Sequence, residues 1–156
     1  MTATNHFITG ALIAATVQRP LLALPLAFVS HFALDVIPHY GYGTMPLKER
    51  DQKKHFILKQ AVDIYFALGL FWLLPFLLRD RQAPIVTALC MFAAFVPDAI
   101  WSAQYVIAQR RGGAYKEPSA FNRFHKAIQW CENSWGIYIE IIWFVLIALG
   151  IRHIAV

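Results

Sequence analysis

Residues 30–39, with the sequence SHFALDVIPH, carry three groups that could bind a metal ion: His31, Asp35 and His39. His31 and Asp35 are four residues apart, so in a helix both side chains lie on one face and can reach the same ion. Pro38 ends or kinks a helix, which places His39 at a turn from which its ring could swing back toward that ion. Histidine with carboxylate suits zinc, manganese or iron(II). The spacing therefore predicts metal-dependent chemistry.

The chain around these groups is too apolar for an ordinary soluble domain. Of its 156 residues, 58% are hydrophobic and 15% are charged, whereas soluble domains have roughly 25% charged residues. We therefore expect residues 1–156 to form one membrane-embedded domain. The net charge of +5 comes from Lys and Arg in short loops between apolar runs, where membrane topology signals lie, so it does not indicate nucleic acid as a partner.

Five apolar segments predict the helices that must position the candidate ligands. They cover residues 4–18, 21–37, 56–78, 83–108 and 135–151. A bilayer core needs about 20 residues per helix, with a range of about 17–25, and the second to fifth segments meet this length. The first is short, and it is either tilted, partly interfacial, or paired with the second in a hairpin around Arg19 and Pro20.

A sixth helix is predicted between the fourth and fifth segments. Within residues 119–135, Phe121, Phe124 and Ile128 recur at helical spacing, with His125 at the edge of this apolar face. This pattern is typical of an amphipathic helix that lies on a membrane surface. The expected fold is an all-α bundle of about five apolar helices plus one interfacial helix.

The distribution of cations predicts the orientation in the membrane. If all five segments cross, the N-terminal side carries nine cations and the other side four. The nine are Lys48, Arg50, Lys53, Lys54, Arg110, Arg111, Lys116, Arg123 and Lys126, and the four are Arg19, Arg79, Arg81 and Arg152. Because cytoplasmic loops are rich in Lys and Arg, we expect a cytoplasmic N-terminus and a C-terminus on the outside.

Ionisable groups inside apolar segments should belong to one site. A charge at the bilayer centre costs at least ~2.5–3.5 kcal/mol, so such groups pair with one another or serve a function. In the expected topology they all fall in the cytoplasmic half of the membrane: His6, His31, Asp35, Asp63, Asp98, Glu140 and, on the interfacial helix, His125. Simpler explanations remain open, since His31 could only bond Asp35, Asp63 could pair with Lys59 one turn back, and Glu140 could bond a neighbouring helix.

Four stretches of the chain resemble bacterial inner-membrane proteins of the YdjM-like group of predicted metal-dependent hydrolases. They are NHFITGALIA, SHFALDVIPH, FVPDAIW and FHKAIQW. The resemblance touches most of the chain and implies a bacterial inner-membrane location. It also implies these metal ligands: His6, His31, Asp35, Asp98 and His125. His39 is a further candidate ligand because of its place at the turn.

The function expected from these features is that of a membrane-embedded metal-dependent hydrolase. One or two divalent ions, most simply zinc, would lower the pKa of a bound water toward ~7. Asp63 or Glu140 would act as general base or would orient a ligand histidine. The substrate would be an amphiphilic membrane lipid, best a phosphoester, reached at the cytoplasmic interface, and a homo-oligomer is left open.

Two other functions fit the same residues. The chain could be a small transport or proton-relay protein without hydrolase activity, because intramembrane Asp, Glu and His also conduct protons. It could also be a structural protein whose polar groups join helices. Metal content separates the hydrolase from both.

Overall fold

The computed structural model describes residues 1–41, 54–111 and 119–156 and confirms the all-α prediction. Six helices and two very short strands follow one another in the described chain. They are α1 (Ala3–Val17), α2 (Pro20–Val36), β1 (His39–Tyr40), α4 (Lys54–Leu77), α5 (Pro84–Arg110), α6 (Ala120–Ile128), β2 (Glu132–Asn133) and α7 (Gly136–Ala155).

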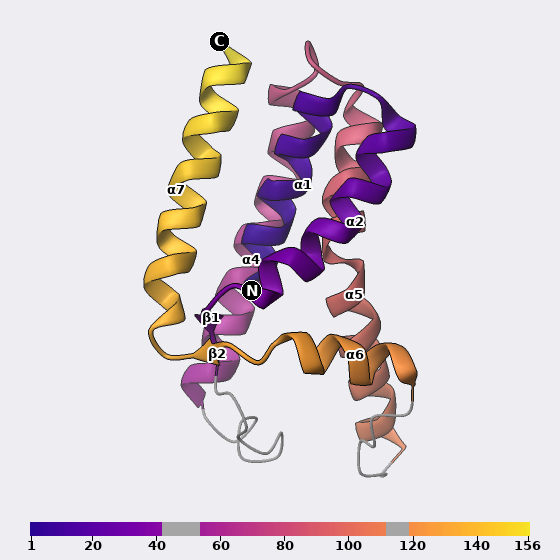
Figure 1. The fold of residues 1–156 in the computed structure, drawn as a ribbon, viewed down its shortest axis with the longest axis vertical. Coiled ribbons are helices and arrows are strands. Elements are labelled where there is room, and N and C mark those ends of the chain that lie inside the picture. The colour runs from indigo at the N-terminus through magenta and orange to yellow at the C-terminus, as the bar shows by residue number, and fades with distance from the viewer. Residues whose placement is uncertain (42–53, 112–118) are drawn as a thin grey trace.

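Helix α1 lies at the centre of the bundle. It contacts α2, α4, α5 and α7, and these helices surround it in Figure 1. Its residues Ala11, Ala14 and Ala15 are buried, as is Gly10. Such small side chains let helix backbones approach closely, which is how helices associate when lipid removes the hydrophobic drive between them. The small residues of α1 therefore give the first segment an interior position.

The first two helices form a hairpin, one of the three arrangements expected for the first segment. Gln18 adopts a left-handed conformation with φ of 55° and donates its N–H to the carbonyl of Ala14, which ends α1. Pro20 then starts α2, where its fixed φ suits the first helical turn. The result places the start of α1 and the end of α2 at the same end of the bundle (Figure 1).

Three helices are long and apolar enough to cross a membrane. The qualifying stretches are Leu58–Leu77, Pro84–Gln104 and Gly136–Ala155. Helix α2 is apolar but has 17 residues, and α1 has 15. Because α1 is enclosed by its neighbours, it needs less length than a helix that faces lipid. The expected run of four full-length spans is thus met by three, with α2 at the lower end of the range.

Helix α6 runs crosswise to the long axis of the bundle in its lower half, and α4 and α5 continue below it (Figure 1). Ser119 caps it, since its hydroxyl accepts the N–H of Asn122 at 3.1 Å. Strand β2 then pairs in parallel with β1, with His39 opposite Glu132, and ties the segment after α6 to the end of α2.

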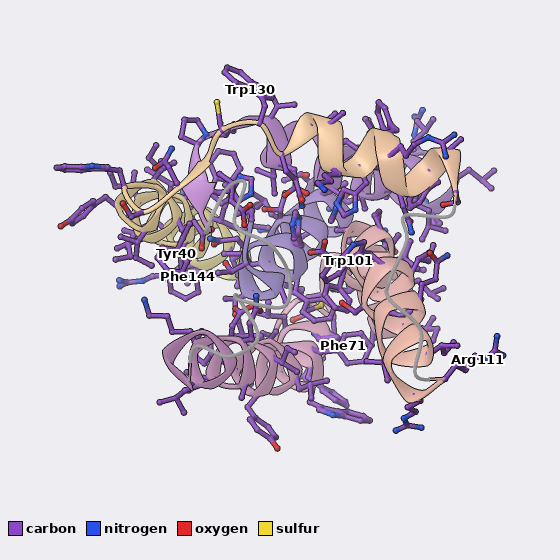
Figure 2. All side chains as sticks on the ribbon, turned by 90° about the horizontal axis from the view of Figure 1, so that it is seen from below. Tyr40, Phe71, Trp101, Arg111, Trp130 and Phe144 are labelled. Atoms are coloured by element: carbon purple, nitrogen blue, oxygen red, sulfur yellow. The ribbon has the colours of Figure 1, made fainter. Side chains whose placement is uncertain are left out.

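The buried face of α6 is polar and includes the predicted ligand His125. Asn122 and His125 are its buried residues, whereas Phe124 is exposed. Asn122 and His125 face the bundle because they form hydrogen bonds there, with Gln104 and Asp35 respectively. The side chain of Phe124 stays exposed on the outer face of the helix. Trp130, just beyond the helix, also points away from the bundle (Figure 2).

Gly10 provides a test of the packing between α1 and α5. A Cβ atom at this position would lie 2.5 Å from the carbonyl oxygen of Cys90 and 2.8 Å from the Cα of Met91. Because both atoms belong to the backbone, Gly10→Ala should push the helices apart and destabilise the protein by about 1–3 kcal/mol. Thermal unfolding of the detergent-purified protein measures this as a lower Tm.

Gly69→Ala and Gly150→Ala are matched controls. A Cβ at Gly69 would meet nothing within 4 Å, and one at Gly150 would lie 3.7 Å from Leu12, an ordinary contact. Both should keep or raise the Tm, since Ala favours a helix over Gly. A Tm of Gly10→Ala equal to that of these controls would contradict the close approach of α1 to α5.

Candidate metal centre

His31 and Asp35 lie together on the face of α2 that points into the bundle. Both side chains are fully buried, and His31 Nε2 lies 3.2 Å from Asp35 Oδ2. The spacing of four residues produces this contact as expected. Helix α2 ends one residue later at Val36, where Ile37 turns extended ahead of Pro38, so Asp35 stands in its last turn.

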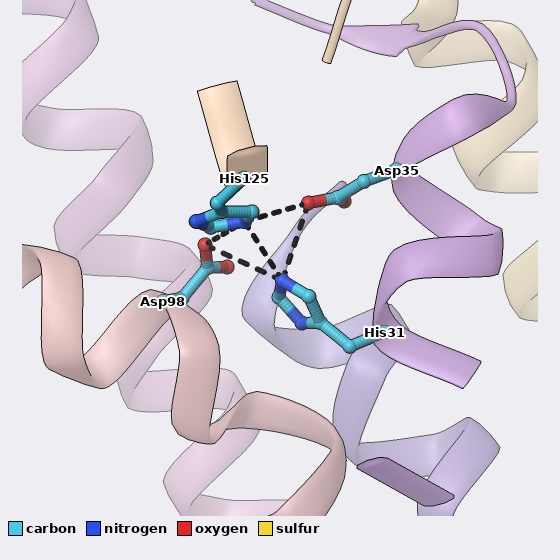
Figure 3. Close-up of side chains that lie close together, drawn as sticks. All are labelled: His31, Asp35, Asp98 and His125. Atoms are coloured by element: carbon cyan, nitrogen blue, oxygen red, sulfur yellow. Dashed lines mark hydrogen bonds and ion pairs between the residues drawn. The ribbon is translucent and has the colours of Figure 1, made fainter. Parts of the chain in front are cut away.

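Two further groups come from other helices to complete the cluster (Figure 3). His125 of α6 places its Nε2 3.0 Å from Asp35 Oδ2 and 3.5 Å from Asp98 Oδ1 of α5. His31 Nε2 lies 3.9 Å from the same Asp98 oxygen. Ligand atoms that each lie about 2.0–2.2 Å from one zinc ion can be at most about 4.4 Å apart. Each of these histidine–carboxylate distances satisfies that limit, so His31, Asp35, Asp98 and His125 could hold one ion.

The hydrogen bond of His31 to α5 fixes which of its nitrogens is available. Nδ1 lies 2.8 Å from the carbonyl oxygen of Ala94, which can only accept, so Nδ1 carries the hydrogen. Nε2 then has a free lone pair, as a metal ligand requires. This lone pair faces His125 Nε2 at 2.9 Å. Either an N–H of His125 or a metal ion must lie between two such nitrogens.

His6 approaches the cluster from α1. Its side chain is fully buried, stacks on the ring of His31 at a centroid distance of 4.1 Å, and places Nε2 3.3 Å from Asp35 Oδ1. Neither ring nitrogen of His6 has a hydrogen-bond partner in the described part of the chain. The structure therefore gathers five predicted ligands in one place: His6, His31, Asp35, Asp98 and His125.

Two contacts to Asp35 were missed by the sequence analysis. The side-chain amide of Gln129 donates to Asp35 Oδ2 at 3.0 Å, and the α-amino nitrogen of Met1 lies 2.5 Å from Oδ1. Gln129 follows His125 by four residues, so helical spacing could have placed both on one face of α6. No local sequence pattern predicts the contact between Met1 and Asp35.

His39, also predicted as a ligand, lies outside the cluster. Its ring is buried, and its Nδ1 donates to the carbonyl of Ile37 at 2.9 Å, within its own turn. Burial lowers the pKa of His39, which favours the neutral ring. Pairing of β1 with β2 fixes this turn, so the ring does not swing back toward Asp35.

Asp63 of α4 caps the start of α1. Its two oxygens accept the backbone N–H groups of Ala3 at 2.8 Å and Thr4 at 3.1 Å. These groups are left unpaired at any helix start, and a carboxylate there also interacts favourably with the helix dipole. Among the described residues no ion pair joins Asp63 to Lys59, the alternative left open, and Lys59 Nζ donates to the hydroxyl of Tyr40 at 2.8 Å. Capping uses one lone pair on each oxygen of Asp63.

Glu140 of α7 also serves neighbouring backbone. Its Oε1 accepts the N–H of Tyr40 at 3.1 Å, and its carbonyl accepts from the side chain of Asn5 at 3.2 Å. Glu140 thereby joins α7 to β1 and α1, which matches the alternative that it bonds a neighbouring helix. In the described residues no hydrogen bond or ion pair links Asp63 or Glu140 to the histidine cluster, so their predicted catalytic roles stay predictions.

Comparisons with family models, with curated proteins and with solved structures found no match to this chain. The resemblance to YdjM-like proteins therefore stays a prediction, and the cluster has to be interpreted from its own geometry.

Asp63→Ala tests whether this residue caps α1. Loss of both hydrogen bonds should lower stability by about 0.5–2 kcal/mol and leave metal content unchanged. Thermal unfolding and elemental mass spectrometry of the purified variant measure the two effects. Asp80→Ala, which removes an exposed carboxylate in the turn after α4, is the control and should change neither. Unchanged stability with lost metal would contradict the capping role.

Proposed function

We propose that the chain is a membrane-embedded metal-dependent hydrolase that holds a divalent ion, most simply zinc, among His31, Asp35, Asp98 and His125. The observation that carries the proposal is the approach of the two Nε2 atoms of His31 and His125 to 2.9 Å beside two carboxylates. A buried carboxylate such as Asp35 needs a cation close by. Imidazole and carboxylate together suit zinc at sites where an open position remains for water or substrate.

The surroundings of the cluster favour hydrolysis over a purely structural ion. A bound zinc ion supplies a water of lowered pKa and polarises the scissile group. The bond from His31 to Ala94 holds the imidazole in the tautomer that leaves Nε2 free. Asp98 is the partly exposed member, with 23% of its side chain accessible, so the cluster reaches the surface of the bundle there. Within the cluster, the side-chain amide of Gln129 donates a hydrogen bond to Asp35 Oδ2.

The position of the cluster supports an amphiphilic substrate. It lies at the α6 end of a bundle with three helices long enough to span a membrane. Exposed aromatic and basic side chains accompany it on or near α6: Phe124, Trp130, Arg123 and Lys126. Aromatic rings favour the membrane interface and cations attract anionic head groups. A lipid phosphoester fits both kinds of side chain, because it lies at the membrane interface and carries an anionic head group.

The proposed orientation places α6 and the cluster at the cytoplasmic face of a bacterial inner membrane, with the C-terminus outside. In support, the helices alternate so that α1 begins, α2 ends and α5 ends on the side of α6 (Figure 1). Four of the nine cations counted for this side, Lys48, Arg50, Lys53 and Lys116, lie outside the described residues. The orientation is chosen because cytoplasmic loops of membrane proteins carry an excess of Lys and Arg.

One observation also favours the proton-relay alternative. A contact of 2.9 Å between the Nε2 atoms of His31 and His125 is the distance at which two imidazoles share a proton. In that case the cluster needs no metal, and the protein would retain its structure when purified with a chelator. Metal content decides between the two functions.

The metal proposal predicts at least about one zinc ion per chain in protein purified in detergent without chelator. His125→Ala should lower the bound zinc by about one ion per chain, because it removes a ligand of that ion. His153→Ala removes an exposed histidine near the end of α7 and should keep the wild-type content. Elemental mass spectrometry measures all three proteins. Absence of metal from the wild-type protein, even after incubation with zinc, would overturn the proposal.

Hydrolase activity is predicted on a fluorogenic phospholipid in mixed micelles. The rate should fall to background in His125→Ala and with chelator, and zinc should restore it only to the wild-type protein. A soluble phosphodiester of the same leaving group is the control for interfacial recognition and should react more slowly. Equal rates of wild type and His125→Ala would exclude this cluster as the source of activity.

A further inference from the structure

The two oxygens of Asp35 face different histidines. Oδ2 lies 3.2 Å from His31 Nε2 and 3.0 Å from His125 Nε2. Oδ1 lies on the other side, 3.3 Å from His6 Nε2. The carboxylate at the end of α2 therefore stands between the histidine pair of α2 and α6 and the single histidine of α1.

Asp98 repeats the same division. Its Oδ1 lies 3.9 Å from His31 Nε2 and 3.5 Å from His125 Nε2. Its Oδ2 lies 3.8 Å from His6 Nε2. Two carboxylates from different helices thus each offer one oxygen to His31 and His125 and the other oxygen to His6. This is the arrangement of a centre in which two carboxylates bridge two cations.

His6 provides independent support for a ligand on its side. The ring is fully buried, yet neither nitrogen has a hydrogen-bond partner in the described part of the chain. A buried polar group without a partner costs about 1–3 kcal/mol, so such groups are rare unless an ion or water completes them. Both carboxylate oxygens lie within the limit of about 4.4 Å for sharing a zinc ion with His6 Nε2.

We infer that His6, Asp35 Oδ1 and Asp98 Oδ2 form a second divalent-cation position, bridged to the first through the two carboxylates. The inference rests on the proposed function, because it needs an ion at His31 and His125. It also narrows the substrate class. Paired ions stabilise both the attacking and the leaving oxygen in phosphoester hydrolysis. Two carboxylates neutralise only half the charge of two divalent ions, so the centre keeps a positive charge that attracts an anionic phosphoester.

A competing cation lies at the same oxygen. The α-amino nitrogen of Met1 is 2.5 Å from Asp35 Oδ1. A carboxylate oxygen has two lone pairs, so this contact leaves one for an ion. The number of ions bound per chain distinguishes an ion at this position from compensation by the amino group alone.

The test loads the full-length protein with Mn²⁺, which is paramagnetic, and combines elemental mass spectrometry with electron paramagnetic resonance. Wild type should bind about two ions per chain and give the spectrum of an exchange-coupled pair, as bridging requires. His6→Gln should bind about one ion and give the spectrum of an isolated Mn²⁺. His39→Gln, which removes a buried histidine outside the cluster, should behave as wild type.

The outcomes separate this inference from the proposed function. One uncoupled ion per chain in wild type overturns the second position and leaves the hydrolase proposal standing, whether or not the variants fold. Two coupled ions in a folded His6→Gln protein, checked by circular dichroism and gel filtration, would place the second ion elsewhere and also overturn the assignment. Wild type without any ion would instead contradict the metal centre itself.

Discussion

Removal of the Asp35 carboxylate from water is the constraint on which this end of the bundle depends. A buried charge is tolerated only when partners compensate it, and those partners cannot come from α2 alone. The structure draws them from α1, α2 and α6, as His6, His31, His125 and Gln129. The meeting of these helices at one point is thus as much an electrostatic requirement as a matter of apolar packing.

The ionisable residues of the apolar segments fall into two classes. Asp63 and Glu140 complete the hydrogen bonding of backbone that the bundle leaves unpaired, at the start of α1 and at β1. His6, His31, His125, Asp35 and Asp98 contact one another instead. The first class fixes the position of α1, and α1 in turn presents His6 to the second. Hydrogen bonds from α4 and α7 to α1 therefore help to set the position of His6 in the cluster.

Local rules predicted much of this arrangement and failed where distant contacts decide. Helical periodicity placed His31 over Asp35, and hydropathy found every long helix. Neither pattern could show that the oxygens of Asp63 cap a helix that begins 60 residues earlier. Neither could show that the ring of His39 hydrogen-bonds within its own turn. On α6 the sequence predicted His125 as a ligand, but it did not show that Asn122 is buried beside it. A single sequence does not reveal where polar partners lie in space.

The order of the ligands along the chain has a consequence for biosynthesis. The α1–α2 hairpin, which carries His6, His31 and Asp35, is synthesised before α6, since His125 lies 94 residues after His31. During membrane insertion the Asp35 carboxylate is without the imidazole of His125 until α6 has been synthesised. The proposed centre can therefore close only after α6 has been synthesised, because His125 comes from that helix.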